Sequence, residues 1–231
     1  MLIEILLVLA VLSPLQTADP LADYRAAAIE RWEADIRALE KLDQQQQDPA
    51  HAVLFLGSSS IRRWESIAKD MAPYPVIQRG YGGAKYSDLA VFTERLLGTH
   101  QFDAVAVFVG NDIVGKKEDK TPEEVLRLVK IVVGKIHEKK TDAPVFLIAI
   151  TPTSSRFAAW DKIQQVNSLL ESYSQAEKLV HYIGTAEHFL DSANKPIDKY
   201  FVEDKLHLNQ EGYKVWSGII KRAFDKVLQD K

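Results

Sequence analysis

Short runs of apolar residues recur along the chain, separated by segments in which apolar and polar residues alternate with a helical period. The runs lie at residues 52–56, 76–77, 104–109, 145–150 and 179–183. Continuous apolar runs are typical of strands buried on both faces of a sheet, and apolar spacings of three and four between them indicate helices with one buried face. Strands that alternate with helices in this way predict a parallel sheet with helices on both sides.

Three segments carry the clearest helical patterns. Apolar residues recur every three or four positions over residues 19–42, and a similar pattern covers residues 209–228. A third helix is expected to begin after Thr121, whose side chain can cap it, with Pro122 as the first helical residue and two glutamates near the positive end of the helix dipole.

The chain is predicted to have three parts. Residues 1–18 contain an apolar run with the length of a signal-peptide core, too short to span a bilayer. We therefore predict a signal peptide over residues 1–18, export to the periplasm or the cell exterior, and no stable membrane span. Since Glu4 stands where a signal peptide normally has Lys or Arg, a buried first helix in a cytoplasmic protein is the alternative. Residues 19–49 then form a helix and linker, and residues 50–231 form one α/β domain.

Composition narrows the classes of function. The 231 residues include 29 Lys and Arg against 32 Asp and Glu, so the net charge is −3 and the basic excess expected of a nucleic-acid-binding protein is absent. The chain contains no cysteine, which excludes disulfide scaffolds, cysteine-ligated metals and thiol nucleophiles. A hydrophobic fraction of 46% is that of an ordinary globular protein.

Polar residues and glycines that could carry chemistry follow the predicted strands. Ligands of parallel α/β sheets bind outside the carboxyl ends of the strands, where these segments meet. Residues 57–60 (Gly-Ser-Ser-Ser) could place a hydroxyl and backbone N–H groups at a helix start, facing a developing anion. They could equally be a helix cap, because serine is a favoured capping residue. The spacing of a phosphate-binding loop is absent.

Three further segments are expected at the same edge. Residues 80–83 hold three glycines, which allow either close approach of the backbone to a ligand or a tight turn. Asn111 can donate to an anion or cap the next turn. Asp204 and His207 are spaced so that their side chains can meet, and a surface pair without a role is the alternative. We predict no metal, because the strand-end segments offer no third ligand.

In this order the four segments resemble the blocks of the SGNH, or GDSL-like, hydrolase family. The family has a Gly-Asp-Ser block, a glycine, a Gly-x-Asn-Asp block and a C-terminal Asp-x-x-His block. The corresponding residues here are 57–59, 82–83, 110–112 and 204–207. The resemblance covers residues 50–215. It is strongest to the branch with the platelet-activating-factor acetylhydrolase catalytic subunits and bacterial esterases, in which Gly-Ser-Ser-Ser-Ile-x-x-Trp and Asp-x-x-His-Leu-Asn-x-x-Gly-Tyr are frequent, as in this chain.

Two positions depart from the family pattern. Ser58 replaces the aspartate of the first block, a replacement that is frequent in this branch and leaves Ser59 as the serine of the block. Gly110 directly precedes Asn111, so the third block lacks one residue, and the shape of its loop does not follow from the family.

The resemblance implies a fold and a mechanism. The fold is a three-layer α/β/α sandwich with a flavodoxin-like parallel sheet of about five strands. The implied activity is hydrolysis of carboxylic esters through an acyl-enzyme, with Ser59 as the nucleophile, His207 as the base and Asp204 orienting the imidazole. Ser58 and Ser60 are the rival nucleophiles. No cofactor and no metal are implied.

The resemblance also implies an oxyanion hole formed by the backbone N–H groups of Ser59 and Gly83 and the side chain of Asn111. The loop after the fourth predicted strand contains Arg156 and Trp160, which we expect to contact the substrate. Its hydroxyls, cation and aromatic rings suit an acetylated saccharide or another small ester with a short acyl group. The alternative is a carbohydrate- or lipid-binding module of the same fold without turnover, and the oligomeric state is not predicted.

Overall fold

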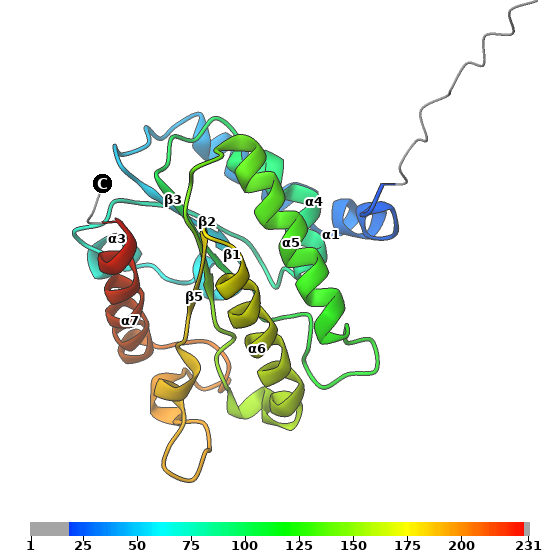
Figure 1. The fold of residues 1–231 in the computed structure, drawn as a ribbon, viewed down its shortest axis with the longest axis vertical. Helices are drawn as coiled ribbons and strands as arrows, with labels where there is room; N and C mark the ends of the chain where they lie inside the picture. Colours follow the sequence, from blue (N-terminus) through cyan, green and yellow to red (C-terminus); the bar gives the residue numbers. More distant parts are fainter. Residues whose placement is uncertain (1–18, 229–231) are drawn as a thin grey trace, which may run out of the picture.

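The computed structural model describes residues 19–228, which form a five-stranded parallel sheet with helices on both faces (Figure 1). The strand order is β2-β1-β3-β4-β5, and every neighbouring pair is parallel. The strands are β1 (Val53–Gly57), β2 (Val76–Gly80), β3 (Ala104–Phe108), β4 (Val145–Ile148) and β5 (Val180–Ile183). This confirms the predicted three-layer α/β/α sandwich with a flavodoxin-like sheet.

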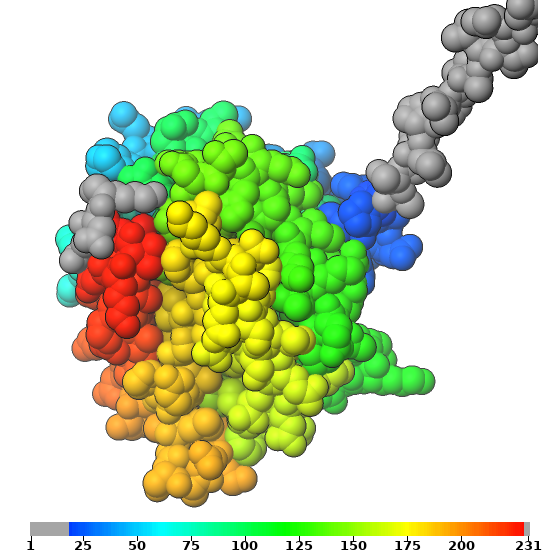
Figure 2. Space-filling view, viewed as in Figure 1, coloured from blue at the N-terminus to red at the C-terminus, as the bar shows by residue number. Residues whose placement is uncertain are grey.

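Each face of the sheet has its own hydrophobic core. In β1, Leu54 and Leu56 belong to one core, and Val53 and Phe55 belong to the other, because successive side chains of a strand point to opposite faces. The first core is covered by α1 (Ala22–Asp43), α4 (Tyr86–Leu97), α5 (Pro122–Lys139) and α6 (Trp160–Ala176). The second is covered by α2 (Ser59–Arg62), α3 (Ile67–Asp70) and α7 (Gln210–Leu228). Figure 2 shows α5 and α6 side by side on the surface of the first layer.

The start of α5 follows the local sequence. The Thr121 hydroxyl accepts a hydrogen bond from the Glu124 N–H at 3.1 Å, and Pro122 is the first helical residue. This confirms the predicted cap, which satisfies one of the free N–H groups of the first turn. The loops at the carboxyl edge of the sheet contain three short 3₁₀ helices, η1 (Ser154–Ala159), η2 (Ala186–Phe189) and η3 (Asp198–Tyr200).

Helix α1 packs against α4 as part of the same hydrophobic core. Its Trp32 is buried there, and its Glu33 and Glu40 both contact the Arg95 guanidinium of α4 at 2.7 Å. The helix confirms the one expected from the periodicity over residues 19–42. The predicted signal peptide lies outside the described residues. Between residues 19 and 228 no helix has the length and hydrophobicity needed to cross a membrane.

The strand order brings the expected site residues together. The chain passes from β1 to β2 on one side and then returns to place β3 on the other side of β1. The loops that follow β1 and β3 are therefore adjacent, at the point of the sheet where ligands of such folds bind. Ser59 lies in the first of these loops and Asn111 lies in the second.

Candidate active site

Ser59 lies at a tight turn between β1 and α2. At Gly57 the turn passes so close to β3 that a Cβ atom would overlap the Phe108 carbonyl oxygen, so only glycine fits there. The Ser58 N–H donates to the same carbonyl at 3.1 Å and ties the turn to β3. Ser59 is then the first residue of α2, where its own N–H is one of the groups that have no partner within the helix.

The side chains of Ser59, His207 and Asp204 form a continuous hydrogen-bonded row. His207 Nε2 lies 3.0 Å from Ser59 Oγ, and His207 Nδ1 lies 2.6 Å from Asp204 Oδ2. Because the carboxylate can only accept, Nδ1 carries a proton and Nε2 is left to accept the serine proton. Within the described chain, Ser59 is the only one of the three serines whose hydroxyl contacts this histidine; Ser58 is buried, with 2% of its surface exposed.

The loop of Asp204 fixes this carboxylate and keeps it ionised. Its second oxygen accepts the backbone N–H groups of Leu206 and His207, both at 2.9 Å. Partial burial acts to raise the pKa of Asp204, but the hydrogen bonds from the His207 ring and the two backbone groups outweigh burial and lower the pKa to about 2. A carboxylate that stays charged can hold the imidazole and stabilise its protonated form.

The residues after His207 anchor this loop to the rest of the site. Leu208 is buried in the second core, and the Asn209 side chain accepts the Gly212 N–H at 3.0 Å at the start of α7. The Tyr213 hydroxyl donates to the Ser60 carbonyl at 2.8 Å, which connects α7 to the serine turn. The sequence His-Leu-Asn-x-x-Gly-Tyr thus keeps the histidine in register with Ser59.

Asn111 is held in place by hydrogen bonds at both ends of its amide. Its Nδ2 donates to the Ala84 carbonyl at 2.9 Å, and its Oδ1 accepts from Arg156 Nη2 at 2.7 Å. Arg156 Nη1 also donates to the Gly110 carbonyl at 2.6 Å. Burial lowers the pKa of the Arg156 guanidinium, an effect that the charge of Asp119 partly offsets.

Gly83 lies next to Ala84 in the turn after β2. Its N–H makes no hydrogen bond within residues 19–228, and the space where its Cβ would lie is open. The preceding residue, Gly82, has φ +32°, and a Cβ there would overlap the ring of Trp32 from α1. Trp32 in turn donates to Asp88 at 3.1 Å in the first turn of α4. Helix α1 thus supports the glycine turn, a contact that periodicity alone does not reveal.

Asp112 has a bracing function. Its Oδ2 accepts the Tyr86 N–H at 2.8 Å at the start of α4, and its Oδ1 lies 3.1 Å from Lys120 Nζ. Burial raises the pKa of this carboxyl, with Lys120 and the hydrogen bonds opposing the increase. The contacts link the loop after β3 to α4 and keep Asp112 away from the reacting groups.

Ser59, Asn111 and His207 meet at a narrow cavity of about 30 Å³, whereas Gly83 and Asp204 are not part of its lining. Its lining includes Ser59, Asn111, Ile150, Thr153, Arg156, Phe201, His207 and Leu208. Trp160, expected to contact substrate, is absent from this lining: it is 7% exposed and packs in the first core. A buried core position explains Trp160 by packing, and we propose no binding role for it. Within the part of the chain that the structure describes, no three His, Asp or Glu side chains are grouped to hold a metal ion.

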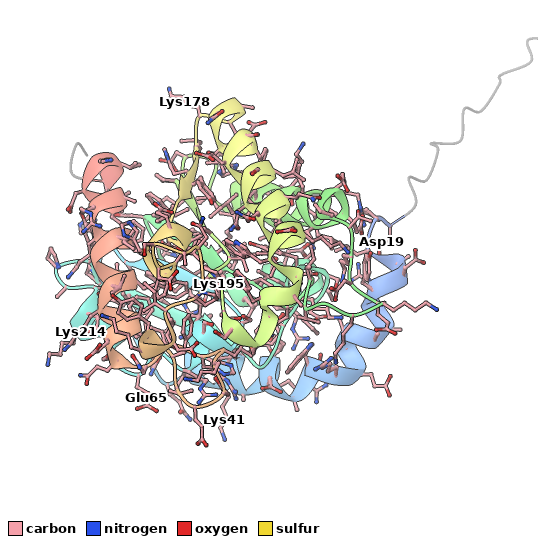
Figure 3. All side chains as sticks on the ribbon, turned by 90° about the horizontal axis from the view of Figure 1, so that it is seen from below. Asp19, Lys41, Glu65, Lys178, Lys195 and Lys214 are labelled. Carbon is pink, nitrogen blue, oxygen red and sulfur yellow. The ribbon has the colours of Figure 1, made fainter. Side chains whose placement is uncertain are left out.

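The rim of the site is formed by the loops that follow β4 and β5. Lys195, in the loop between η2 and η3, places its Nζ 4.8 Å from the ring centre of Phe157 in η1. Figure 3 views the molecule from this side and shows Lys195 toward the middle, with Lys178 and Lys214 at the periphery. The loop that carries Lys195 therefore packs onto the segment that carries Arg156.

Residues 47–215 match the GDSL-like lipase/acylhydrolase family. The chain belongs to this family. The match spans the serine turn, the glycine turn, Asn111 and the Asp204–His207 pair, and it confirms the family resemblance seen in the sequence. As a member of the GDSL-like acylhydrolases, the chain is a carboxylic ester hydrolase.

Solved structures share the fold of this GDSL-like acylhydrolase. A Streptococcus pneumonia protein provisionally described as a platelet activating factor is 20% identical, with a TM-score of 0.72 over 87% of this chain and 95% of its own. A GDSL-like lipase from Bacteroides thetaiotaomicron is 19% identical, with a TM-score of 0.63 over 90% of this chain and 100% of its own. An acetyl-xylooligosaccharide esterase from Geobacillus Stearmophilus is 14% identical, with a TM-score of 0.61 over 77% of this chain and 95% of its own. No curated protein matches the sequence significantly.

Proposed function

We propose that the protein is a serine esterase that removes short acyl groups, acetyl above all, from small or saccharide alcohols. The observation that carries this proposal is the position of His207, whose two ring nitrogens lie 3.0 Å from Ser59 Oγ and 2.6 Å from Asp204 Oδ2. A serine hydroxyl is a weak nucleophile until an adjacent base removes its proton, and this row of contacts supplies such a base and its orienting carboxylate.

The reaction has two halves. His207 Nε2 takes the Ser59 proton as Oγ bonds to the ester carbonyl carbon and an electron pair moves to the carbonyl oxygen. When the carbonyl re-forms, the alcohol leaves with the proton from His207, and the acyl group stays on Ser59. Water then repeats the attack with its proton going to His207, and expulsion of Ser59 Oγ, which takes this proton back, releases the carboxylic acid.

The oxyanion of each half needs donors on the side away from His207. The N–H of Ser59 at the start of α2, the unpaired N–H of Gly83 and the second Nδ2 hydrogen of Asn111 are suited to this role. Donors that are in place before the reaction stabilise the developing charge without having to reorganise. Removing one such donor typically lowers kcat by about 10²–10³-fold.

The size of the cavity favours a short acyl group. The cavity beside Ser59 is narrow, about 30 Å³, and a narrow cavity favours a small acyl group such as acetyl over a long acyl chain. The likeness in fold to the Geobacillus acetyl-xylooligosaccharide esterase makes acetylated saccharides the first substrates to test.

The test combines covalent labelling with a substrate series. A fluorophosphonate should label the wild-type protein and the Ser60→Ala control but not Ser59→Ala, with all three showing the same melting temperature. The kcat/KM of p-nitrophenyl esters should fall from acetyl to butyryl to octanoyl, and acetate should be released from acetylated xylooligosaccharides. Labelling that persists in Ser59→Ala would overturn the assignment of the nucleophile. A wild-type protein that neither labels nor hydrolyses would support the binding module instead.

A further inference from the structure

The Arg156 side chain makes a forked contact with the loop that carries Asn111. Nη1 donates to the Gly110 carbonyl at 2.6 Å, and Nη2 donates to Asn111 Oδ1 at 2.7 Å. The guanidinium is planar and rigid, so two such bonds fix the Gly110 carbonyl and the Asn111 amide relative to each other. In the family pattern one further residue stands between the glycine and the asparagine that correspond to Gly110 and Asn111.

The partners of the amide leave it only one orientation. A guanidinium has no acceptor, so the atom of Asn111 that faces Arg156 must be the oxygen. The Ala84 carbonyl has no donor, so the atom that faces it must be Nδ2. The nitrogen is therefore directed to the turn that also carries Gly83, and a rotated amide would lose both hydrogen bonds.

The charge of Arg156 is not used in an ion pair. Between residues 19 and 228 no carboxylate lies within ion-pair distance of its guanidinium, whereas Arg79, which is more deeply buried, binds Asp43 at 2.6 Å. Keeping a partly buried cation without a counter-charge has a desolvation cost, and such groups concentrate at functional sites.

We propose that Arg156 is a positioning residue for the oxyanion hole: it fixes the Asn111 amide with Nδ2 toward the Gly83–Ala84 turn and so replaces the constraint of the residue missing from the loop. This inference rests on the proposed function, in which Asn111 is an oxyanion donor. The positive charge of the Arg156 guanidinium beside Oδ1 also polarises the amide and makes its N–H groups stronger donors. Arg156 acts through Asn111 and does not need to touch the substrate.

A double-mutant cycle with p-nitrophenyl acetate separates this role from substrate binding. Arg156→Met should lower kcat by about tenfold to a hundredfold, the value of a hydrogen bond to a charged group, with little change in KM. In the Asn111→Ala background the same substitution should lower kcat by less than about threefold, because no amide is left to orient. An effect of Arg156→Met that is equal in both backgrounds, or confined to KM, would overturn the proposal.

Two further variants separate the charge of Arg156 from its forked contact. Lys117→Met removes a cation from the exposed part of the loop after β3, which also carries Asn111. Lys117 makes no ion pair with any residue between 19 and 228, so the kcat of this variant should equal that of the wild type. Arg156→Lys keeps the charge but cannot form the fork, so it should recover only part of the activity. Full activity in Arg156→Lys would mean that charge alone matters and would contradict the positioning role.

The contact can also be tested without any activity measurement. Asn111→Leu removes the oxygen that Arg156 binds. The substitution should lower the melting temperature by about 3 °C or more beyond its effect in the Arg156→Met background, where the guanidinium is already absent. The same loss in both backgrounds would overturn the proposed contact. Because this arm needs no substrate, it stays decisive even if the protein hydrolyses none of the esters and the proposed function fails.

Discussion

Asp204 and His207 lie three positions apart in one loop, and two backbone N–H groups of that loop complete the carboxylate's contacts. Asn111, which lines the same cavity as His207, depends on residues 27 and 45 positions away, the Ala84 carbonyl and the Arg156 guanidinium. The proposed acid–base pair is thus a local structure, while the proposed oxyanion side exists only after distant segments have packed together.

The glycine turn on the oxyanion side depends on a further distant segment, helix α1. Trp32 lies against Gly82, so a helix outside residues 47–215, the part that matches the family, supports the turn of Gly83. Substitutions in the local half should therefore mainly change the chemistry, with any effect on stability confined to the contacts of this one loop. Substitutions around the oxyanion half should change both, and they should depend on one another.

The largest effect is expected in the local half. His207→Ala should lower kcat by about 10⁶-fold, because without the base the serine stays protonated. Its melting temperature should change little, since the loop is held by backbone contacts and by Leu208. His188→Ala, at an exposed histidine outside the cavity lining, is the matched control and should keep full activity. Activity in His207→Ala within tenfold of the wild type would remove this residue from the mechanism.

The next largest effect is expected at the orienting carboxylate. Asp204→Asn should lower kcat by about 10⁴-fold, because the amide favours the wrong imidazole tautomer and cannot stabilise the imidazolium. The pKa of Asp204 is lowered to about 2, so this group stays ionised above pH 4. Ionisation of Asp204 should therefore contribute no pH dependence to the kcat of the wild type between pH 8 and 5.

The lowered pKa of Asp204 also predicts how the stability of the folded protein depends on pH. A carboxyl whose pKa is lower in the folded state stabilises that state above its unfolded pKa of about 4, and the contribution is lost as the pH falls through the folded value of about 2. Melting curves of wild type and Asp204→Asn should therefore differ most at neutral pH and converge as the pH approaches 2. A difference that grows on acidification would contradict the hydrogen bonds assigned to Asp204.

A smaller effect is expected on the oxyanion side. Asn111→Ala should lower kcat by about 10²–10³ with little change in KM, since the lost donor acts mainly in the transition state. The substitution should also lower the melting temperature, because it removes the hydrogen-bond partner of Arg156 Nη2 and of the Ala84 carbonyl. An unchanged kcat would show that another group meets the oxyanion and that the shortened loop has moved Asn111 out of range.

The two halves also differ in how well sequence alone predicts them. The parallel sheet, the cap at Thr121 and the convergence of Asp204 and His207 follow from short-range patterns, and the structure has all three. The long-range contacts of Trp32 and Arg156 have no short-range signature, because an aromatic at helical spacing and a loop arginine have many possible partners. The same reasoning expected Trp160 at the substrate, whereas this first residue of α6 is buried in the first core.

The smallest effect comes from the glycine turn, and two adjacent positions provide a matched test. Gly82→Ala adds a Cβ that would overlap the Trp32 ring, at a backbone φ of +32°. We expect a loss of about 1–3 kcal/mol in the free energy of unfolding, and a lower kcat because the turn carrying Gly83 must shift. Gly83→Ala places its Cβ in open space, so its melting temperature should match that of the wild type.

The source of the Gly82 effect can be checked by making room for the new methyl group. Trp32→Leu is destabilising alone because it leaves a cavity in the core. In the double variant the Cβ of Gly82→Ala occupies part of that space, so the loss should be smaller than the sum of the two single losses, as measured by chemical denaturation. Strict additivity would mean that Gly82 is required only for its backbone angle. In that case α1 would contribute to the core without supporting the oxyanion turn, and the two halves of the site would be less different than their contacts suggest.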